Sequence, residues 1–179
     1  MSSLQIIFSG VGGQGLMVAG NILGRAAVEK MGLYAAMSSA YGVETRGTFT
    51  KSDIIISEAE IDFPEALDPD VVLALDPIAY QRYASSLSAS SLLVVDTAFA
   101  GLSTRANQLA FPIAALAKEA GNAASANVVA LGLLLGLTEV VSYAALQGSI
   151  ASEFAGRTSI IAINLKALDA GLAAVAQSV

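Results

Sequence analysis

The chain has 179 residues, which is enough for one domain with a core of ordinary size. It is 55% hydrophobic and 13% charged, against roughly 25% charged residues in typical soluble domains. We therefore expect another protein to cover part of the surface, although a deeply buried α/β core gives a similar composition. A net charge of −6 with nine basic residues argues against nucleic-acid binding.

Cysteine and histidine are both absent from the sequence. This excludes disulfides, thiolate-held iron–sulfur clusters, zinc held by Cys or His, and catalysis by a cysteine nucleophile or a histidine base on this chain. Any redox or acyl chemistry is therefore expected to have its reactive centre on another chain. The lack of cysteine is also consistent with the cytoplasmic location that we predict.

Along the chain, short apolar runs typical of buried strands alternate with longer helix-like stretches, so the sequence predicts strands and helices in alternation. The predicted strands cover residues 4–9, 33–37, 48–57, 71–75, 92–95 and 108–111. The predicted helices cover residues 14–31, 77–85, 112–120, 127–137, 142–154 and 159–176. This order predicts a Rossmann-like, three-layer α/β fold with a mostly parallel sheet, in a single domain over residues 1–179. The uncharged stretch 120–138 is interrupted by polar residues, so we expect a buried helix there and no membrane span, which needs about 20 apolar residues.

A glycine-rich turn follows the first predicted strand. Gly10, Gly12 and Gly15 fit the pattern G-x-G-x-x-G between a strand and a helix. Glycine tolerates positive φ and allows close approach, and the helix start that follows favours an anion. Gly13 and Gln14 make the turn unusual, because Gln14 can bring an amide to the helix start. The pattern predicts an anion site, or alternatively a turn that only lets helix and strand pack closely.

A nicotinamide-binding unit usually carries an acidic residue roughly 20 positions after the glycines, to hold the ribose hydroxyls. Residues 35–39 hold no carboxylate here, and no basic residue for a 2′-phosphate stands there either. The first acidic residue is Glu44. The sequence therefore argues against an ordinary NAD or NADP site.

The polar connection predicted over residues 38–47 is a second candidate site. It carries Tyr41, Glu44 and Arg46, and a guanidinium can bind a carboxylate or phosphate through two hydrogen bonds. The alternative is a surface ion pair between Glu44 and Arg46, which contributes little. We expect this segment, the glycine turn, Asp76 and Asp96 to share the carboxyl edge of the sheet, with the two aspartates as helix caps.

Small residues four apart, Gly132 and Gly136, lie on one face of the predicted helix 127–137. Their spacing predicts close packing against a neighbouring element, and we favour a core contact over a subunit interface.

Several segments in order resemble one protein family. They are 10–15 (GVGGQG), 40–47 (AYGVETRG), 52–57 (SDIIIS), 61–64 (IDFP), 127–132 (NVVALG) and 164–168 (NLKAL). Together they are similar to the gamma subunit of 2-oxoacid:ferredoxin (acceptor) oxidoreductases, with 40–47 closest to the 2-oxoglutarate type. Thr48 departs from the small residue expected in many members, which weakens the choice of substrate more than the choice of family.

The resemblance implies a role in a complex that decarboxylates a 2-oxoacid, forms an acyl-CoA and reduces ferredoxin. Thiamine diphosphate, Mg and iron–sulfur clusters would lie on partner alpha, beta and delta subunits, and this chain would carry no catalytic residue. It would support assembly and close the site around substrate or coenzyme A, with a homodimer contact as a further expectation. The residues implied at that coenzyme-facing site are Gly10, Gly12, Gly13, Gln14, Gly15, Tyr41, Glu44, Arg46 and Asn127.

Two alternatives stay open on the sequence. One is a stand-alone nucleotide-binding α/β enzyme. The other is a subunit of the related indolepyruvate oxidoreductase, or a purely architectural subunit.

Overall fold

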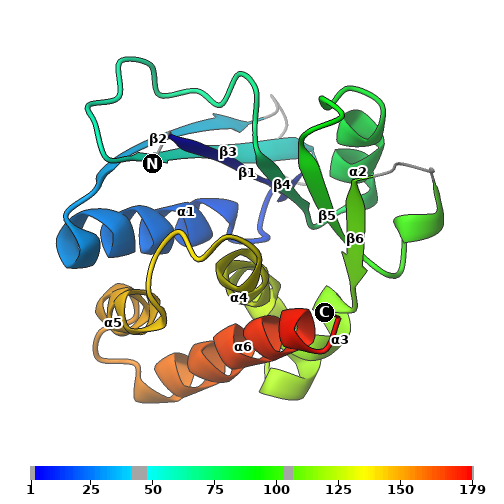
Figure 1. The fold of residues 1–179 in the computed structure, drawn as a ribbon. Coiled ribbons are helices and arrows are strands. Elements are labelled where there is room, and N and C mark those ends of the chain that lie inside the picture. Colours follow the sequence, from blue (N-terminus) through cyan, green and yellow to red (C-terminus); the bar gives the residue numbers. More distant parts are fainter. Residues whose placement is uncertain (1–2, 42–47, 103–106, 179) are drawn as a thin grey trace.

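A six-stranded sheet forms the centre of the computed structural model, which describes residues 3–41, 48–102 and 107–178 (Figure 1). Its spatial order is β2-β3-β1-β4-β5-β6. The strands are β1 (Leu4–Val11), β2 (Tyr34–Tyr41), β3 (Phe49–Ser57), β4 (Val71–Ala74), β5 (Leu92–Asp96) and β6 (Gln108–Phe111). The helices are α1 (Leu16–Arg25), α2 (Pro77–Ala84), α3 (Ile113–Ala120), α4 (Ala126–Thr138), α5 (Tyr143–Glu153) and α6 (Thr158–Ala176). Shorter helical turns are η1 (Ala26–Lys30), η2 (Ala100–Leu102) and η3 (Ala123–Ser125).

Strand direction confirms the predicted α/β fold with a mostly parallel sheet. β1 pairs in parallel with β4, β4 with β5, and β5 with β6, whereas β3 runs antiparallel to both of its neighbours, β1 and β2. Five strands therefore point one way and β3 points the other. As predicted, the carboxyl ends of these five strands place the glycine turn, the end of β2, Asp76 and Asp96 at one edge of the sheet.

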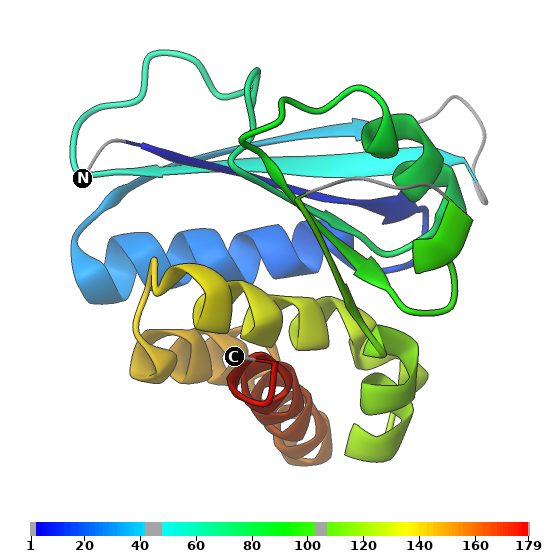
Figure 2. The same ribbon diagram turned by 45° about the vertical axis from the view of Figure 1, so that its right-hand side comes forward.

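Helices cover the two faces of the sheet unequally. α1 and α4 lie against one face, with α5 and α6 packed outside them, while α2 covers the other face (Figures 1 and 2). Because both faces are covered, the central strands read as continuous apolar runs: Ile6, Ile7 and Phe8 of β1 are at most 2% exposed. The predicted buried helix is α4, in which every residue from Asn127 to Leu135 is buried.

α6 is the one helix in the described part of the chain that is long and apolar enough to span a membrane, judged by length and composition alone. It packs against α4 (Figure 2), and 28% of its most apolar window is buried inside the protein.

Candidate functional site at the glycine turn

The glycine turn leads from β1 into α1 with two residues in the left-handed region. The turn is closed by the Gln14 N–H, which donates to the Val11 carbonyl at 3.3 Å. Gly13 has φ of 96° and Gly15 has φ of 71°. Glycine is favoured at both positions because an L side chain rarely adopts such a φ. The turn thus delivers the start of α1 to the carboxyl edge of the sheet, as the pattern predicted.

Gln14 fills the space that the first glycine leaves open. Its Oε1 accepts a hydrogen bond from the Val11 N–H, and its Nε2 donates to the Leu75 carbonyl, both at 2.9 Å. A Cβ at Gly10 would lie 2.0 Å from Gln14 Oε1, so this glycine is required by the glutamine amide. Gln14 therefore ties the end of β1 to the end of β4.

Asn127 occupies the equivalent space beside Gly15. Its Nδ2 donates to the Gly15 carbonyl at 2.9 Å, and a Cβ at Gly15 would lie 2.6 Å from that nitrogen. The side chain is only 5% exposed. The amide thus locks α4 to the glycine turn across 112 positions of sequence. Both amides hold the turn in place, and Gly13, with no atom within 4 Å of an added Cβ, faces open space.

A hollow of about 220 Å³ opens beyond the turn and receives the carboxylate of Asp96. Asp96 Oδ1 accepts from Ala98 N at 2.8 Å, and Oδ2 accepts from Ala114 N at 2.7 Å in the first turn of α3. Among the described residues that line the hollow there is no Lys or Arg. Since a buried carboxylate already occupies this helix start, the hollow itself disfavours a second anion.

Both aspartates at this edge cap helices, as the sequence predicted. Asp76 Oδ1 accepts from Ile78 N at 2.9 Å in the first turn of α2, with Pro77 in that turn. Asp96 caps α3, which begins 17 residues later in the sequence and receives no side-chain cap from its own N-cap, Pro112.

The second predicted site, the connection over residues 38–47, lies only partly within the described residues, and it begins later in the chain than predicted. Residues 38–41, predicted as a connection, belong to β2, because β3 pairs along the whole strand, from Tyr34 opposite Ser57 to Tyr41 opposite Thr50. Tyr41 thus ends an edge strand. Glu44 and Arg46 lie outside the described residues.

The position of β3 gives a physical reason why residues 35–39 hold no acidic residue that could bind a ribose. β3 lies between β1 and β2, so the end of β2 is two strand spacings, roughly 10 Å, from the end of β1. An acidic residue there would not lie beside the glycine turn. The sequence predicted this strand but not its antiparallel direction or its place between β1 and β2, although the six residues between Tyr41 and Thr48 are far too few for a parallel crossover.

A buried polar cluster on the α2 face was also missed. Asp53 is 0% exposed, and its Oδ2 lies 2.6 Å from Lys51 Nζ and accepts from Ala66 N at 3.4 Å. Its other oxygen, Oδ1, is buried with no hydrogen-bond partner among the described residues. Burial, and then the charge of Asp53, raise the pKa of Tyr83 to about 12. The signal was available, because residues 51 and 53 must share one face of a strand.

Metal ligation has no candidate in the described residues, where no three or more Asp or Glu side chains gather as a metal site would require.

Fold and turn together define a class: an α/β domain of Rossmann type whose glycine turn is filled by its own amides. The sequence model of the family described as pyruvate ferredoxin/flavodoxin oxidoreductase matches residues 5–174, and the chain belongs to this family. It is 34% identical to the 2-oxoglutarate synthase subunit KorC of Methanocaldococcus jannaschii over 82% of this chain and 81% of that one. It is 33% identical to the ketoisovalerate oxidoreductase subunit VorA of Methanothermobacter marburgensis, over 94% of this chain and 36% of that longer one.

A solved structure agrees with these relatives. The gamma subunit of a keto/oxoacid ferredoxin oxidoreductase from Geobacter sulfurreducens superimposes with a TM-score of 0.83 and 34% identity. The match covers 97% of this chain and 99% of that one, so the two folds correspond from end to end.

Proposed function

We propose that this chain is the gamma subunit of a cytoplasmic, CoA-acylating 2-oxoacid:ferredoxin oxidoreductase, with 2-oxoglutarate as its 2-oxoacid. The observation that carries the proposal is the end-to-end match, at 34% identity, with a gamma subunit that is itself a separate chain. A chain without Cys or His needs its redox centres elsewhere. In our proposal, as the family resemblance implies, thiamine diphosphate, Mg and iron–sulfur clusters lie on the alpha, beta and delta subunits, and electrons reach ferredoxin through them.

The turn geometry supports a positioning role for this chain. Gln14 and Asn127 hold the turn rigidly, so that Gly12 and Gly13 stand at a fixed edge. In this proposal Arg46, which lies outside the described residues, supplies the positive charge, because a guanidinium suits the phosphates of coenzyme A. In this proposal Gly12 and Gly13, with Tyr41, Glu44 and Arg46, contact coenzyme A or a neighbouring subunit without supplying a catalytic group. The buried residues Gly10 and Asn127, together with Gln14 and Gly15, hold the turn from behind.

Sequence identity does not separate the substrates, because the 2-oxoglutarate and ketoisovalerate relatives are 34% and 33% identical to this chain. The reconstituted complex should therefore be assayed for ferredoxin reduction with 2-oxoglutarate, pyruvate, ketoisovalerate and indolepyruvate. We expect the highest kcat/KM with 2-oxoglutarate. A preference for indolepyruvate would favour the alternative subunit.

Two variants in the reconstituted complex test the role of the turn. Arg46→Ala removes one charge-assisted contact and should raise the KM for coenzyme A by about tenfold, with kcat little changed. Gly13→Val introduces a side chain at φ of 96° into the open edge and should raise the same KM. The matched control is Gly32→Val, a similarly strained position with φ of 67° and open space, after η1 and away from that edge. Unchanged kinetics for Arg46→Ala and Gly13→Val would instead make the subunit architectural.

A stand-alone nucleotide-dependent enzyme is the alternative, and the inserted strand β3 argues against it. Calorimetry on the isolated chain with NAD, NADP, FAD and ATP should give no binding heat. Saturable binding of any of them would favour the alternative.

A further inference from the structure

The net charge of the protein is concentrated in one segment, residues 58–70, here called the acidic arch. The chain has fifteen acidic and nine basic residues, and the arch holds six of the acidic and none of the basic ones. The nine remaining acidic residues equal the nine basic residues in number, so the rest of the chain is formally neutral. The carboxylates of the arch are Glu58, Glu60, Asp62, Glu65, Asp68 and Asp70.

The arch is held firmly at its base, although it contains no helix or strand. Asp70 exchanges two hydrogen bonds with the backbone of Gln5: its N–H donates to the Gln5 carbonyl at 2.8 Å, and its Oδ2 accepts from Gln5 N at 2.7 Å. Asp68 N donates to Gln5 Oε1 at 3.3 Å, and Ala66, 7% exposed, donates to the buried Asp53. The arch is therefore preorganised, which lowers the entropy lost on binding.

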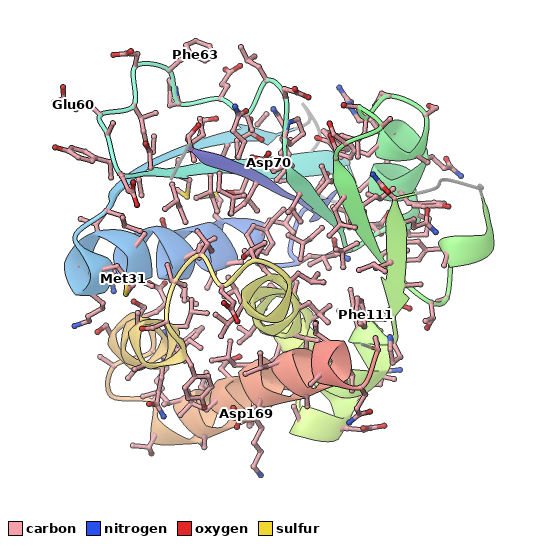
Figure 3. All side chains as sticks on the ribbon, viewed as in Figure 1. Met31, Glu60, Phe63, Asp70, Phe111 and Asp169 are labelled. Atoms are coloured by element: carbon pink, nitrogen blue, oxygen red, sulfur yellow. The ribbon has the colours of Figure 1, made fainter. Side chains whose placement is uncertain are left out.

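The arch also carries the two most exposed large apolar side chains in the described part of the chain. Phe63 is 51% exposed and Leu67 is 76% exposed. Figure 3 shows Phe63 on the outer side of the arch, pointing away from the sheet, and Glu60 at another point of the same arch. An aromatic side chain held in place on a rigid loop is the type of group that anchors protein interfaces.

A hollow of about 400 Å³ lies between the arch and the strands beneath it. The residues that line it include the apolar Ile55, Phe63 and Leu67 and the acidic Glu60, Asp62 and Glu65, and none of its described lining residues is basic. An arginine or lysine side chain fits both features, because its aliphatic stem contacts apolar walls while its charged head meets carboxylates.

We propose that the acidic arch docks this chain onto a basic surface of a sister subunit, with an arginine or lysine of that subunit entering the hollow. That the partner is a sister subunit depends on the proposed function above. That the partner's surface is basic depends only on the residues of the arch. The arch joins the end of β3 to the start of β4, so it lies at the opposite edge of the sheet from the glycine turn (Figure 1). Docking there leaves the turn free to face coenzyme A.

The test titrates this full-length chain into the assembled sister alpha and beta chains of the same organism. Phe63→Ser with Leu67→Ser removes the apolar anchors, and Glu60→Lys with Asp62→Lys reverses the charge. Each double variant should raise the Kd by about tenfold or more, and wild-type binding should weaken as salt increases from about 0.05 to about 0.5 M. The matched controls are Val28→Ser, at a side chain that is 49% exposed on η1, and Glu119→Lys on α3, and both should bind as wild type does.

Thermal unfolding of each isolated variant should match wild type, because all of these side chains are on the surface. Equal binding by wild type and both arch variants would overturn the docking inference and leave the proposed function standing. Failure of the wild-type chain to bind the sister chains at all would overturn the proposed function, and the arch's partner with it.

Discussion

Tyr83 on α2 links protonation to stability through its burial beside a carboxylate. The ring is 9% exposed, and burial together with the charge of Asp53 raises the pKa of the phenol to about 12, while a hydrogen bond with Ser9 opposes the shift. The folded state therefore holds the phenolic proton more tightly than the unfolded state, whose tyrosine titrates near 10. The stabilisation is fully present below pH 10 and is lost as the pH rises toward 12.

Tyr83→Phe should remove this part of the pH dependence. Between about pH 9 and pH 12 the wild type should lose about 2 kcal/mol of unfolding free energy more than the variant does. Urea unfolding followed by circular dichroism at both pH values measures the difference. Tyr34→Phe, at a ring that is 48% exposed, is the control and should follow wild type. Parallel pH profiles for wild type and Tyr83→Phe would contradict the shift.

Single residues at the turn show what a sequence can and cannot predict about the candidate site. The positive φ of Gly15 follows from the G-x-G-x-x-G pattern, whereas Gly13, which also has positive φ, stands at one of its variable positions. The amide of Gln14 at the helix start was also predicted from the sequence. The contact of Asn127 with Gly15 was not, since no local rule relates positions 112 apart. The sequence left open whether the glycines serve an anion or close packing, and in the structure Gly10 and Gly15 make room for these two amides. The coenzyme-facing role of the turn stays a prediction.

At the scale of the element, α4 and α6 approach each other through a pair of glycines. A Cβ at Gly132 would lie 2.2 Å from the Leu168 carbonyl oxygen, and one at Gly171 would lie 2.2 Å from the Val129 carbonyl oxygen. Gly136 packs against the side chain of Val175, whose Cβ would lie 2.9 Å from an added Cβ, so the predicted core contact is confirmed. The partner glycine, Gly171, was not predicted, because spacing within one helix indicates a small face without indicating what meets it.

Alanine at either glycine should separate the two helices. Gly132→Ala or Gly171→Ala should destabilise the protein by about 2–4 kcal/mol, because the obstacle is backbone that cannot rotate away. Gly24→Ala on α1, where the nearest atom is 4.0 Å from the added Cβ, should instead stabilise by about 0.5–1 kcal/mol through helix propensity. Chemical unfolding of the three variants gives the comparison. Equal stability of all three would show that α6 can shift without cost.

Element order was predictable to a large extent, because every strand and α-helix expected from the periodicity is present within a few residues. The direction in which each strand runs was harder to predict from the sequence. Periodicity reports which faces of a strand are buried and says nothing about which way the strand runs, so β3 was not recognised as antiparallel. The antiparallel strand β3 lies between β2 and β1, and this insertion distinguishes the sheet from a dinucleotide-binding one.

At the scale of the whole molecule, burial is steeply graded from the centre to the two edges of the sheet. From Val128 to Leu135, the residues of α4 are at most 7% exposed. The edge strands differ: no residue of β2 from Tyr34 to Ala40 is buried, and β6 is buried only at Phe111. Such a gradient predicts that α4 opens only when the whole protein unfolds, while the edges open locally.

Amide hydrogen exchange on the isolated chain should show this gradient. Amides of α4 should exchange slower than those of β2 by a factor on the order of 10³, with β1 and β4 close to α4.

β2 has no proline and no charged residue to protect its open edge from another strand. Its protection is therefore also the sensitive readout for the predicted homodimer contact, and exchange should be measured at low and high protein concentration. Protection of β2 equal to that of α4 at every concentration would contradict the gradient, whereas protection that appears only at high concentration would place a second copy at this edge.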